Sequence, residues 1–368
     1  LTLRGYGCLA RGATRIMTRN QTRVRTALSI VVIGAIIGAG YAAFLDLVIR
    51  SELSGVTFLR GAVRGFVVSL IVLVFEFSFS GSRYGRALRK APFLQSLGLR
   101  TIATTAVLLA AIVGSRLLLG SGGRSLSQWL DVGLPRDFAF AAIVAFLIHF
   151  VLQTRRLIGG RELTNFLLGR YHRPVSEERI FMLLDIVGST AIARRLGDAK
   201  ALELICRFFF DIAEAIARYD GDTHIYVGDE VVISWPMLSK EQNARCLECY
   251  VSIVTMLAQK QKEYIQDYGQ ALDVRVGIHG GTVVSGECGD DKRQIVYIGD
   301  TINLTKRLQE SCRDYDRRVI VSGELLNRLE VPAGILREDL GNKVLRGRDI
   351  ETHLYSLDLA GAATRERD

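Results

Sequence analysis

Two aspartates are the residues of this chain best placed to do chemistry. Asp185 ends an apolar run within Phe-Met-Leu-Leu-Asp-Ile-Val-Gly-Ser-Thr, and Asp229 lies in a turn between two apolar runs, in Tyr-Val-Gly-Asp-Glu. A carboxylate that ends a buried strand and precedes a Gly-Ser-Thr loop can hold a metal ion beside a phosphate. Two such carboxylates make a two-metal site possible, in which a phosphoryl group is polarised and an attacking hydroxyl is activated. The pair therefore indicates phosphoryl or nucleotidyl transfer on a nucleoside triphosphate.

Two further polar residues, Asn303 and Arg307, lie in a segment that we expect to be helical from Asp300 to about Glu310. Residues four positions apart share one face of a helix, so both side chains can reach the same ligand. We expect Asp300 to cap this helix, since aspartate is a favoured capping residue.

Charge is distributed unevenly along the 368 residues. The first 160 residues carry 19 Lys and Arg against 5 Asp and Glu, whereas the remainder carries 28 against 33. A basic excess can indicate nucleic-acid binding. Here the basic residues lie between long apolar runs, which is typical of membrane topology. We therefore expect a lipid bilayer as a partner and no nucleic acid.

Four apolar runs cover residues 27–49, 62–79, 102–119 and 138–152. Crossing a bilayer takes about 20 apolar residues, so the runs predict a four-helix membrane domain over 27–152. The tail 1–26 and the loop between the second and third runs hold most of the Lys and Arg. This asymmetry predicts a multi-pass protein of the plasma (inner) membrane with both termini cytoplasmic. Four polar residues within the runs are expected to pair across helices, with proton or signal sensing as the alternative: Asp46, Glu76, Arg116 and His149.

The second half of the chain shows a different pattern. Residues 153–178 are basic and amphipathic, which predicts a juxtamembrane coupling helix ended by Pro174. Strand patterns follow at 179–186, 223–227, 231–235, 274–279 and 282–286, and helical patterns at 190–196, 198–219 and 240–264. Together they predict one α+β domain over 179–358, with a mainly antiparallel sheet and covering helices. Residues 359–368 are expected to form a disordered tail.

Four motifs in this order make residues 179–358 resemble the catalytic domain of class III nucleotidyl cyclases, the adenylyl and guanylyl cyclases. They are the Asp185 and Asp229 motifs above, Gly-Asp-Thr-Ile-Asn-Leu-Thr-Lys-Arg at 299–307 and Leu-Arg-Gly-Arg at 345–348. The resemblance implies a ferredoxin-like core and two Mg²⁺ or Mn²⁺ per active site. It implies metal binding by Asp185, Asp229 and the carbonyl of Ile186. It further implies that the triphosphate is bound by the amides of Gly188, Ser189 and Thr190 and by Arg346. Asn303 would bind the ribose, and Arg307 would bind the α-phosphate.

The base-recognition positions depart from the family pattern. Adenylyl cyclases of this family commonly use a Lys and an Asp where this chain has Ile225 and Val296. Neither side chain can hydrogen-bond a purine edge. Base choice then falls to backbone groups or to neighbours such as His224, Gln294 or Tyr297. Adenine is expected from family frequency, and guanine stays open.

The resemblance also implies how the chain assembles and what it makes. Family members place the metal aspartates of one protomer opposite the Asn and Arg of the other, so we expect a homodimer through the catalytic domain and the juxtamembrane helix. The expected reaction is attack of the ribose 3′-hydroxyl of ATP on the α-phosphorus, giving 3′,5′-cyclic AMP and pyrophosphate. The alternatives are a guanylate cyclase with the same mechanism, a diguanylate cyclase, and a catalytically decayed nucleotide-binding receptor or scaffold. The Asn303 and Arg307 motif disfavours the diguanylate cyclase.

Overall fold

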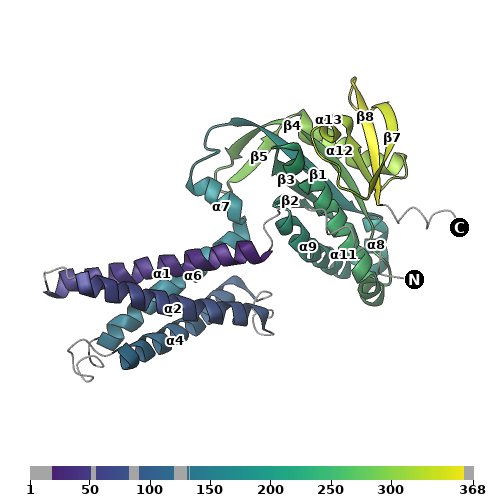
Figure 1. Ribbon diagram of the computed structural model, residues 1–368. Helices are drawn as coiled ribbons and strands as arrows, with labels where there is room; N and C mark the ends of the chain where they lie inside the picture. The colour runs from purple at the N-terminus through teal and green to yellow at the C-terminus, as the bar shows by residue number, and fades with distance from the viewer. Residues whose placement is uncertain (1–18, 51–54, 83–90, 120–130, 132, 360–368) are drawn as a thin grey trace. The chain divides into compact units, whose positions relative to one another are not determined.

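The structure is a computed structural model that describes residues 19–50, 55–82, 91–119, 131 and 133–359. The chain divides into two compact units, Arg15–Gly160 and Arg161–Asp368, each treated by itself below. Within the described residues the first unit is helical and the second combines a sheet with helices (Figure 1). This agrees with the predicted fold class.

The first unit contains four long helices, α1 (Arg19–Arg50), α2 (Gly55–Gly81), α4 (Phe93–Leu119) and α6 (Leu134–Ile158). In the described part of the chain, each has a span long and apolar enough to cross a membrane, with mean hydropathy between 1.8 and 2.1. Large apolar side chains such as Ile36, Leu59 and Ile102 are about two-thirds exposed. An apolar surface of this kind suits contact with lipid.

Helices α1 and α2 pack with their backbones in close contact. A Cβ atom added to Gly38 would lie 2.5 Å from the carbonyl oxygen of Gly61 and 2.7 Å from the Cα of Gly65. Gly34 is equally crowded, since its added Cβ would meet Ser69. Small residues spaced by four therefore bring the two helices together, as is common where helices associate in lipid.

Polar side chains join α4 to α6 and α1 to α6. His149 Nε2 and Thr104 Oγ1 are 2.8 Å apart, and Gln153 donates to Ser96 Oγ at 3.2 Å. The Tyr41 hydroxyl donates to Asp137 at 2.8 Å. Asp46 is buried. Residues 1–18 of the tail and the 83–90 loop, whose charges predict the orientation, lie outside the described residues, as do the side chains of Glu76 and Arg116; the rest of the tail is the start of α1.

The segment after α6 is not one continuous helix. Gly159 has φ 103°, and a short helix α7 (Gly160–Leu167) follows it. The predicted helix over the juxtamembrane segment is therefore broken at Gly159 and ends well before Pro174. The reason is the left-handed backbone at Gly159, which a glycine adopts without strain.

The second unit is built on an eight-stranded sheet with the order β2-β3-β1-β4-β6-β8-β7, and β5 pairs with β4. The strands are β1 (Val175–Ile186), β2 (Asp222–Val227), β3 (Glu230–Pro236), β4 (Val274–Cys288), β5 (Gln294–Ile298), β6 (Val319–Ser322), β7 (Ile335–Val344) and β8 (Glu351–Leu359). Among these pairs only β4 with β6 is parallel. The two strands expected at 274–279 and 282–286 are one long strand, β4.

Alternation along β1 separates the two faces of the sheet. Ile180, Met182 and Leu184 are fully buried in the main core, where they pack with α9 (Asp198–Arg218) and α11 (Arg245–Tyr268). Phe181 and Leu183 point to the opposite face. Side chains on a strand alternate between faces, so Arg179 and Asp185 share that opposite face, called the α12 face below. Figure 1 shows α9 and α11 together beside the sheet.

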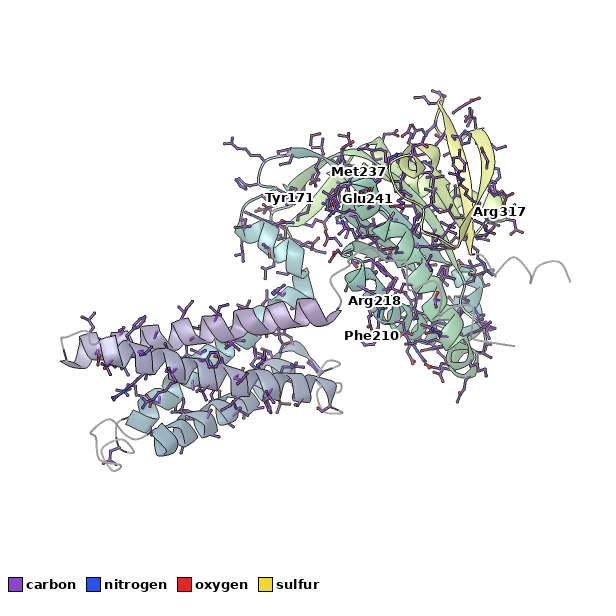
Figure 2. The ribbon with its side chains drawn as sticks, viewed as in Figure 1. Tyr171, Phe210, Arg218, Met237, Glu241 and Arg317 are labelled. Atoms are coloured by element: carbon purple, nitrogen blue, oxygen red, sulfur yellow. The ribbon has the colours of Figure 1, made fainter. Side chains whose placement is uncertain are left out.

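The remaining helices of this unit are α8 (Ser189–Leu196), α10 (Lys240–Asn243), α12 (Asp300–Asp314) and α13 (Gly323–Leu326). Helix α12 lies against β4 at two glycines. A Cβ on Gly277 would lie 2.4 Å from the backbone nitrogen of Gln309, and one on Gly281 would lie 2.8 Å from Thr301 Oγ1. The outer side of α9 is in contrast exposed, and Phe210 projects from it with 70% of its surface accessible (Figure 2).

Candidate active site

The register of the sheet brings Asp185 and Asp229 together. Strands β1 and β3 are antiparallel, with Leu184 paired to Val231, so the end of β1 lies beside the start of β3. Asp229 and Gly228 form the turn that connects β2 to β3. Hydrogen bonding between the two carboxyl groups is one cause of the pKa shift of Asp185. The structure therefore places the two acids next to each other, as the metal-site hypothesis requires.

The electrostatics of this pair favour a cation. Burial, then the hydrogen bond and charge of Asp229 and the charge of Glu230, raise the pKa of Asp185 to about 7, while Lys306 acts in the opposite direction. Crowded carboxylates resist being charged together unless a cation neutralises them. Oδ2 of Asp229 is buried and has no hydrogen-bond partner among the described residues.

These observations fit a divalent cation. No group of three or more His, Cys, Asp or Glu side chains suited to a metal occurs among the described residues. The two carboxylates, with the carbonyl of the next residue Ile186, would supply an all-oxygen donor set, which is the kind Mg²⁺ prefers, and Mg²⁺ usually completes its shell with water and substrate phosphate. Among the neighbouring side chains, Lys306 forms an ion pair with Glu230, and the uncharged Gln309 amide donates to Asp185 Oδ2 at 3.3 Å.

The Gly-Ser-Thr loop begins helix α8 directly after β1. Gly188 is the N-cap residue with φ 71°, a left-handed conformation, and the helix start has no side-chain cap. Ser189 is half-buried and Thr190 is exposed. The first N–H groups of a helix have no intrahelical acceptor and carry partial positive charge, so they suit a phosphate beside the carboxylate pair.

Helix α12 presents the two residues that the sequence singled out. Asn303 is exposed, and the side chain of Arg307 is 40% exposed and paired with Glu310 at 2.9 Å. A Cβ on Gly347 would lie 3.9 Å from Arg307 Nη2, so the turn between β7 and β8 approaches this face of the helix. Arg346, the expected phosphate ligand, is exposed in the same turn.

The start of α12 differs from the expectation. Gly299, with φ 154°, is the N-cap residue, and no side chain caps the helix. Asp300 instead forms an ion pair with Arg348 at 2.8 Å. The prediction that Asp300 caps the helix is therefore wrong. Its carboxylate forms an ion pair with Arg348, in the distant turn between β7 and β8, and Gly299 is the N-cap residue.

The base-recognition positions lie on β2 and β5. Ile225 is 39% exposed on β2, and Val296 pairs with Gly286 in the β4–β5 ladder. Gln294 is exposed. Beside them, the ring of His224 contacts the ring of Tyr297 edge-on, with centroids 4.7 Å apart.

A buried arginine that is not part of any of the four motifs, Arg179, lies on the α12 face of the sheet. Arg179 is 5% exposed, and its guanidinium donates to Ser234 Oγ at 2.8 Å and lies 3.4 Å from Asp222. It also lies 3.5 Å from Glu177 and 5.0 Å from the centre of the Tyr297 ring. The signal was present in the sequence, because counting back from Asp185 in steps of two puts Arg179 on the α12 face.

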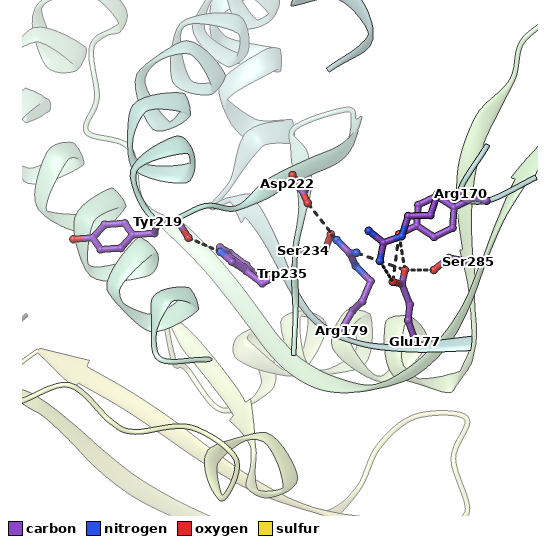
Figure 3. A network of polar contacts seen from close by, with 9 residues as sticks. Arg170, Glu177, Arg179, Tyr219, Asp222, Ser234, Trp235 and Ser285 are labelled. Atoms are coloured by element: carbon purple, nitrogen blue, oxygen red, sulfur yellow. Dashed lines mark hydrogen bonds and ion pairs between the residues drawn. The ribbon is translucent and has the colours of Figure 1, made fainter. Parts of the chain in front are cut away.

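Glu177 connects this arginine to the segment that precedes the sheet. It accepts hydrogen bonds from Ser285 Oγ and from the Tyr171 hydroxyl, the latter at 3.1 Å, and Arg170 lies 3.8 Å from it. Figure 3 shows Glu177 between Arg170, Arg179 and Ser285. In the same view the indole of Trp235 donates to the carbonyl of Tyr219 at 2.9 Å.

Comparison with known proteins identifies the class. Residues 174–357 match the family model described as the adenylate and guanylate cyclase catalytic domain. The chain therefore belongs to the class III nucleotidyl cyclases, a family of phosphorus–oxygen lyases.

Individual relatives support this assignment. The chain is 35% identical to "Adenylate cyclase 2" of Rhizobium meliloti (strain 1021), over 81% of this chain and 83% of that protein. That match is longer than the catalytic domain, so it extends into the part that carries the long apolar helices. A second protein of that organism, "Adenylate cyclase 1", is 24% identical over 49% of this chain and 27% of its own length. Among solved structures, a bacterial light-regulated adenylyl cyclase shares the fold at TM-score 0.50 and 19% identity, covering 58% of this chain and 64% of that one.

Proposed function

We propose that this protein is a membrane-bound adenylate cyclase that converts ATP to 3′,5′-cyclic AMP and pyrophosphate in a homodimer, with two Mg²⁺ or Mn²⁺ per active site. The observation that carries the proposal is that Asp185, at the end of the strand that leads into helix α8, lies next to Asp229. The choice of ATP is supported by the relative from Rhizobium meliloti, whose name states adenylate cyclase activity. The four apolar helices support a location in the plasma (inner) membrane, and we keep the expectation that both termini are cytoplasmic.

Each residue of the site has a defined task in this proposal. Asp185, Asp229 and the Ile186 carbonyl would hold the ions, which when bound supply polarisation of the α-phosphate and neutralisation of the leaving pyrophosphate. The N–H groups at Gly188, Ser189 and Thr190, together with Arg346, would bind the terminal phosphates. Asn303 would orient the ribose, so that its 3′-hydroxyl attacks in line with the departing pyrophosphate. Arg307 would donate to the α-phosphate, where negative charge increases in the transition state.

The geometry of α12 supports a site shared by two protomers. Gln309 reaches Asp185 of its own chain. At 3.6 residues per turn, Arg307 is directed about 160° and Asn303 about 120° away from Gln309 around the helix axis. Both side chains therefore point away from the carboxylates of their own protomer, and a second copy related by a two-fold axis would receive them.

Product analysis tests the proposal. The purified full-length protein is incubated with ATP or GTP and Mn²⁺, and the products are identified by mass spectrometry. Cyclic AMP is expected from the wild type, and a loss of at least about 100-fold is expected for Asp185→Asn. If more cyclic GMP forms from GTP than cyclic AMP from ATP, the protein is a guanylate cyclase, a possibility that Ile225 and Val296 leave open. No cyclic nucleotide from either substrate would show a decayed, nucleotide-binding domain and refute the proposal.

A further inference from the structure

Strand β2 contains a β-bulge at His224. Thr223 pairs with Ile233 of β3, and Ile225 pairs with the next residue, Val232, so His224 is an extra residue in the ladder. Without the bulge, His224 and Ile225 would point to opposite faces of the sheet. The extra residue allows both to lie on the α12 face, and bulges of this kind often redirect a side chain next to an active site.

Contacts confirm that His224 lies on the α12 face. Its ring meets Tyr297, which packs edge-on against Phe181 with centroids 5.3 Å apart. Phe181 belongs to the apolar cluster on that face, together with Val232, the pairing partner of Ile225. His224 is therefore a neighbour of the position where family members commonly carry the base-binding Lys.

The imidazole of His224 is available for hydrogen bonding. None of the described residues forms a hydrogen bond with either of its ring nitrogens. Burial, and secondarily the charge of Arg179, lower the pKa of His224 to about 4, so the ring is neutral near pH 7. A neutral imidazole offers one donor and one acceptor. A purine edge presents complementary groups, such as the amino group and N1 of adenine.

The surroundings hold this ring in place. Tyr297 covers one side of it, and Arg179 lies under Tyr297 with its guanidinium fixed by Ser234, Asp222 and Glu177. A buried arginine with several partners is costly to displace, so Arg179 provides a fixed support for the Tyr297 ring that contacts His224. Rigid, prepositioned groups are what discrimination between ligands requires.

We propose that His224 recognises the purine of the nucleoside triphosphate, in place of the Lys and Asp that Ile225 and Val296 replace. The proposal rests on the function proposed above and adds the residue that reads the base. It differs from the family arrangement, because the reading group comes from the bulge and not from either family position.

The test uses two substitutions at one position in the full-length protein. His224→Phe keeps a ring against Tyr297 but removes both nitrogens, whereas His224→Gln keeps a donor and an acceptor. We expect His224→Phe to raise the KM for ATP about tenfold with kcat changed less than about twofold, and His224→Gln to restore most of that loss. Tyr226→Phe is the matched control, since Tyr226 lies two residues along β2 and packs against Phe209.

The readouts separate this proposal from the one it rests on. Affinity for 3′-deoxy-ATP and 3′-deoxy-GTP, which lack the attacking hydroxyl, is measured beside turnover, with the thermal unfolding temperature as a folding control. A wild type that binds these nucleotides but makes no cyclic product refutes the proposed function and still allows the His224 test by affinity. If His224→Phe binds and turns over ATP and GTP within twofold of the wild type, or if Gln is as defective as Phe, base recognition by His224 is refuted.

Discussion

The close contact between β4 and α12 leads to a sharp prediction for Gly277→Ala. The added Cβ would lie 2.4 Å from the backbone nitrogen of Gln309 and 2.5 Å from the carbonyl oxygen of Thr305. Both are backbone atoms of the helix, so no side-chain rotation can relieve the overlap. Restoring ordinary van der Waals separation requires α12 to move by about 1 Å, and overpacking of this kind costs about 1–3 kcal/mol.

The displaced helix carries two of the proposed catalytic residues, and an error of about 1 Å in catalytic geometry can cost about 100-fold in rate. We expect Gly277→Ala to lower kcat by about 10- to 100-fold, up to the full cost of a displacement of about 1 Å. The protein should stay folded, with a lower unfolding temperature. Cyclic nucleotide formation and thermal unfolding are measured on the same preparation. The control is Gly286→Ala in the same strand, where the nearest atom to an added Cβ, in Pro174, is 3.9 Å away. Equal activity of the Gly277→Ala variant, the Gly286→Ala variant and the wild type would refute the argument that helix position limits catalysis.

Three further predictions concern other parts of the chain. Because its folded pKa of about 7 is raised above the ordinary 3.8, Asp185 in metal-free protein binds a proton more tightly when folded; stability should therefore fall as pH rises from about 4 to about 7. Asp185→Asn should flatten this part of a plot of unfolding temperature against pH, and an unchanged slope would contradict the raised pKa. Gly38→Ile should lower the unfolding temperature in detergent by several degrees, whereas Gly40→Ile, whose added Cβ meets nothing within 4 Å, should be tolerated; equal effects would argue against close α1–α2 packing. Arg348→Gln removes the ion pair with Asp300 and should raise the KM for ATP several-fold with little change in kcat, measured by steady-state kinetics. An unchanged KM would show that the pair does not position the turn that carries Arg346.

The positions of Asp185 at a strand end and of Asp229 in a turn were predictable from the sequence, because each aspartate has a strong local signal. Asp185 follows a short run of apolar residues that favours a buried strand before a Gly-Ser-Thr loop, and Asp229 lies in a Gly-Asp turn. The antiparallel register of β1 and β3 then brings the two together. Local patterns therefore sufficed for the strand end at Asp185 and for the β2–β3 hairpin turn at Asp229, whereas the β1–β3 pairing joins strands separated by α8, α9 and β2.

Features that depend on distant residues were not predictable in the same way. Gly280 and Gly281 suggest a break between two strands, yet β4 continues through them because β1 pairs with it from Val274 to Ser285 and α12 needs the room at Gly281. Strand β5 was missed, since it is only five residues long and follows the polar run Asp290–Arg293. The partner of Asp300 is 48 positions away at Arg348, so no local capping rule could identify it.

The bulge at His224 shows the same limit at the level of one residue. Alternation along β2 predicts the face of each side chain only while the ladder is regular. One additional residue changes the face of everything beyond it, and the sequence Thr-His-Ile-Tyr has no glycine or proline to mark the place. Its position became clear only from pairing with β3.

The hydrogen bond from Tyr171 to Glu177 has a consequence for engineering the protein. The family match begins at residue 174, which would be a natural place to join a light- or ligand-sensing module to the cyclase. Such a junction would remove Tyr171 and Arg170, and with them two of the groups that hold Glu177 against Arg179. Chimeras should therefore be joined upstream of Arg170, so that the contacts of Glu177 with Tyr171, Arg170 and Arg179 are transferred together with the catalytic domain.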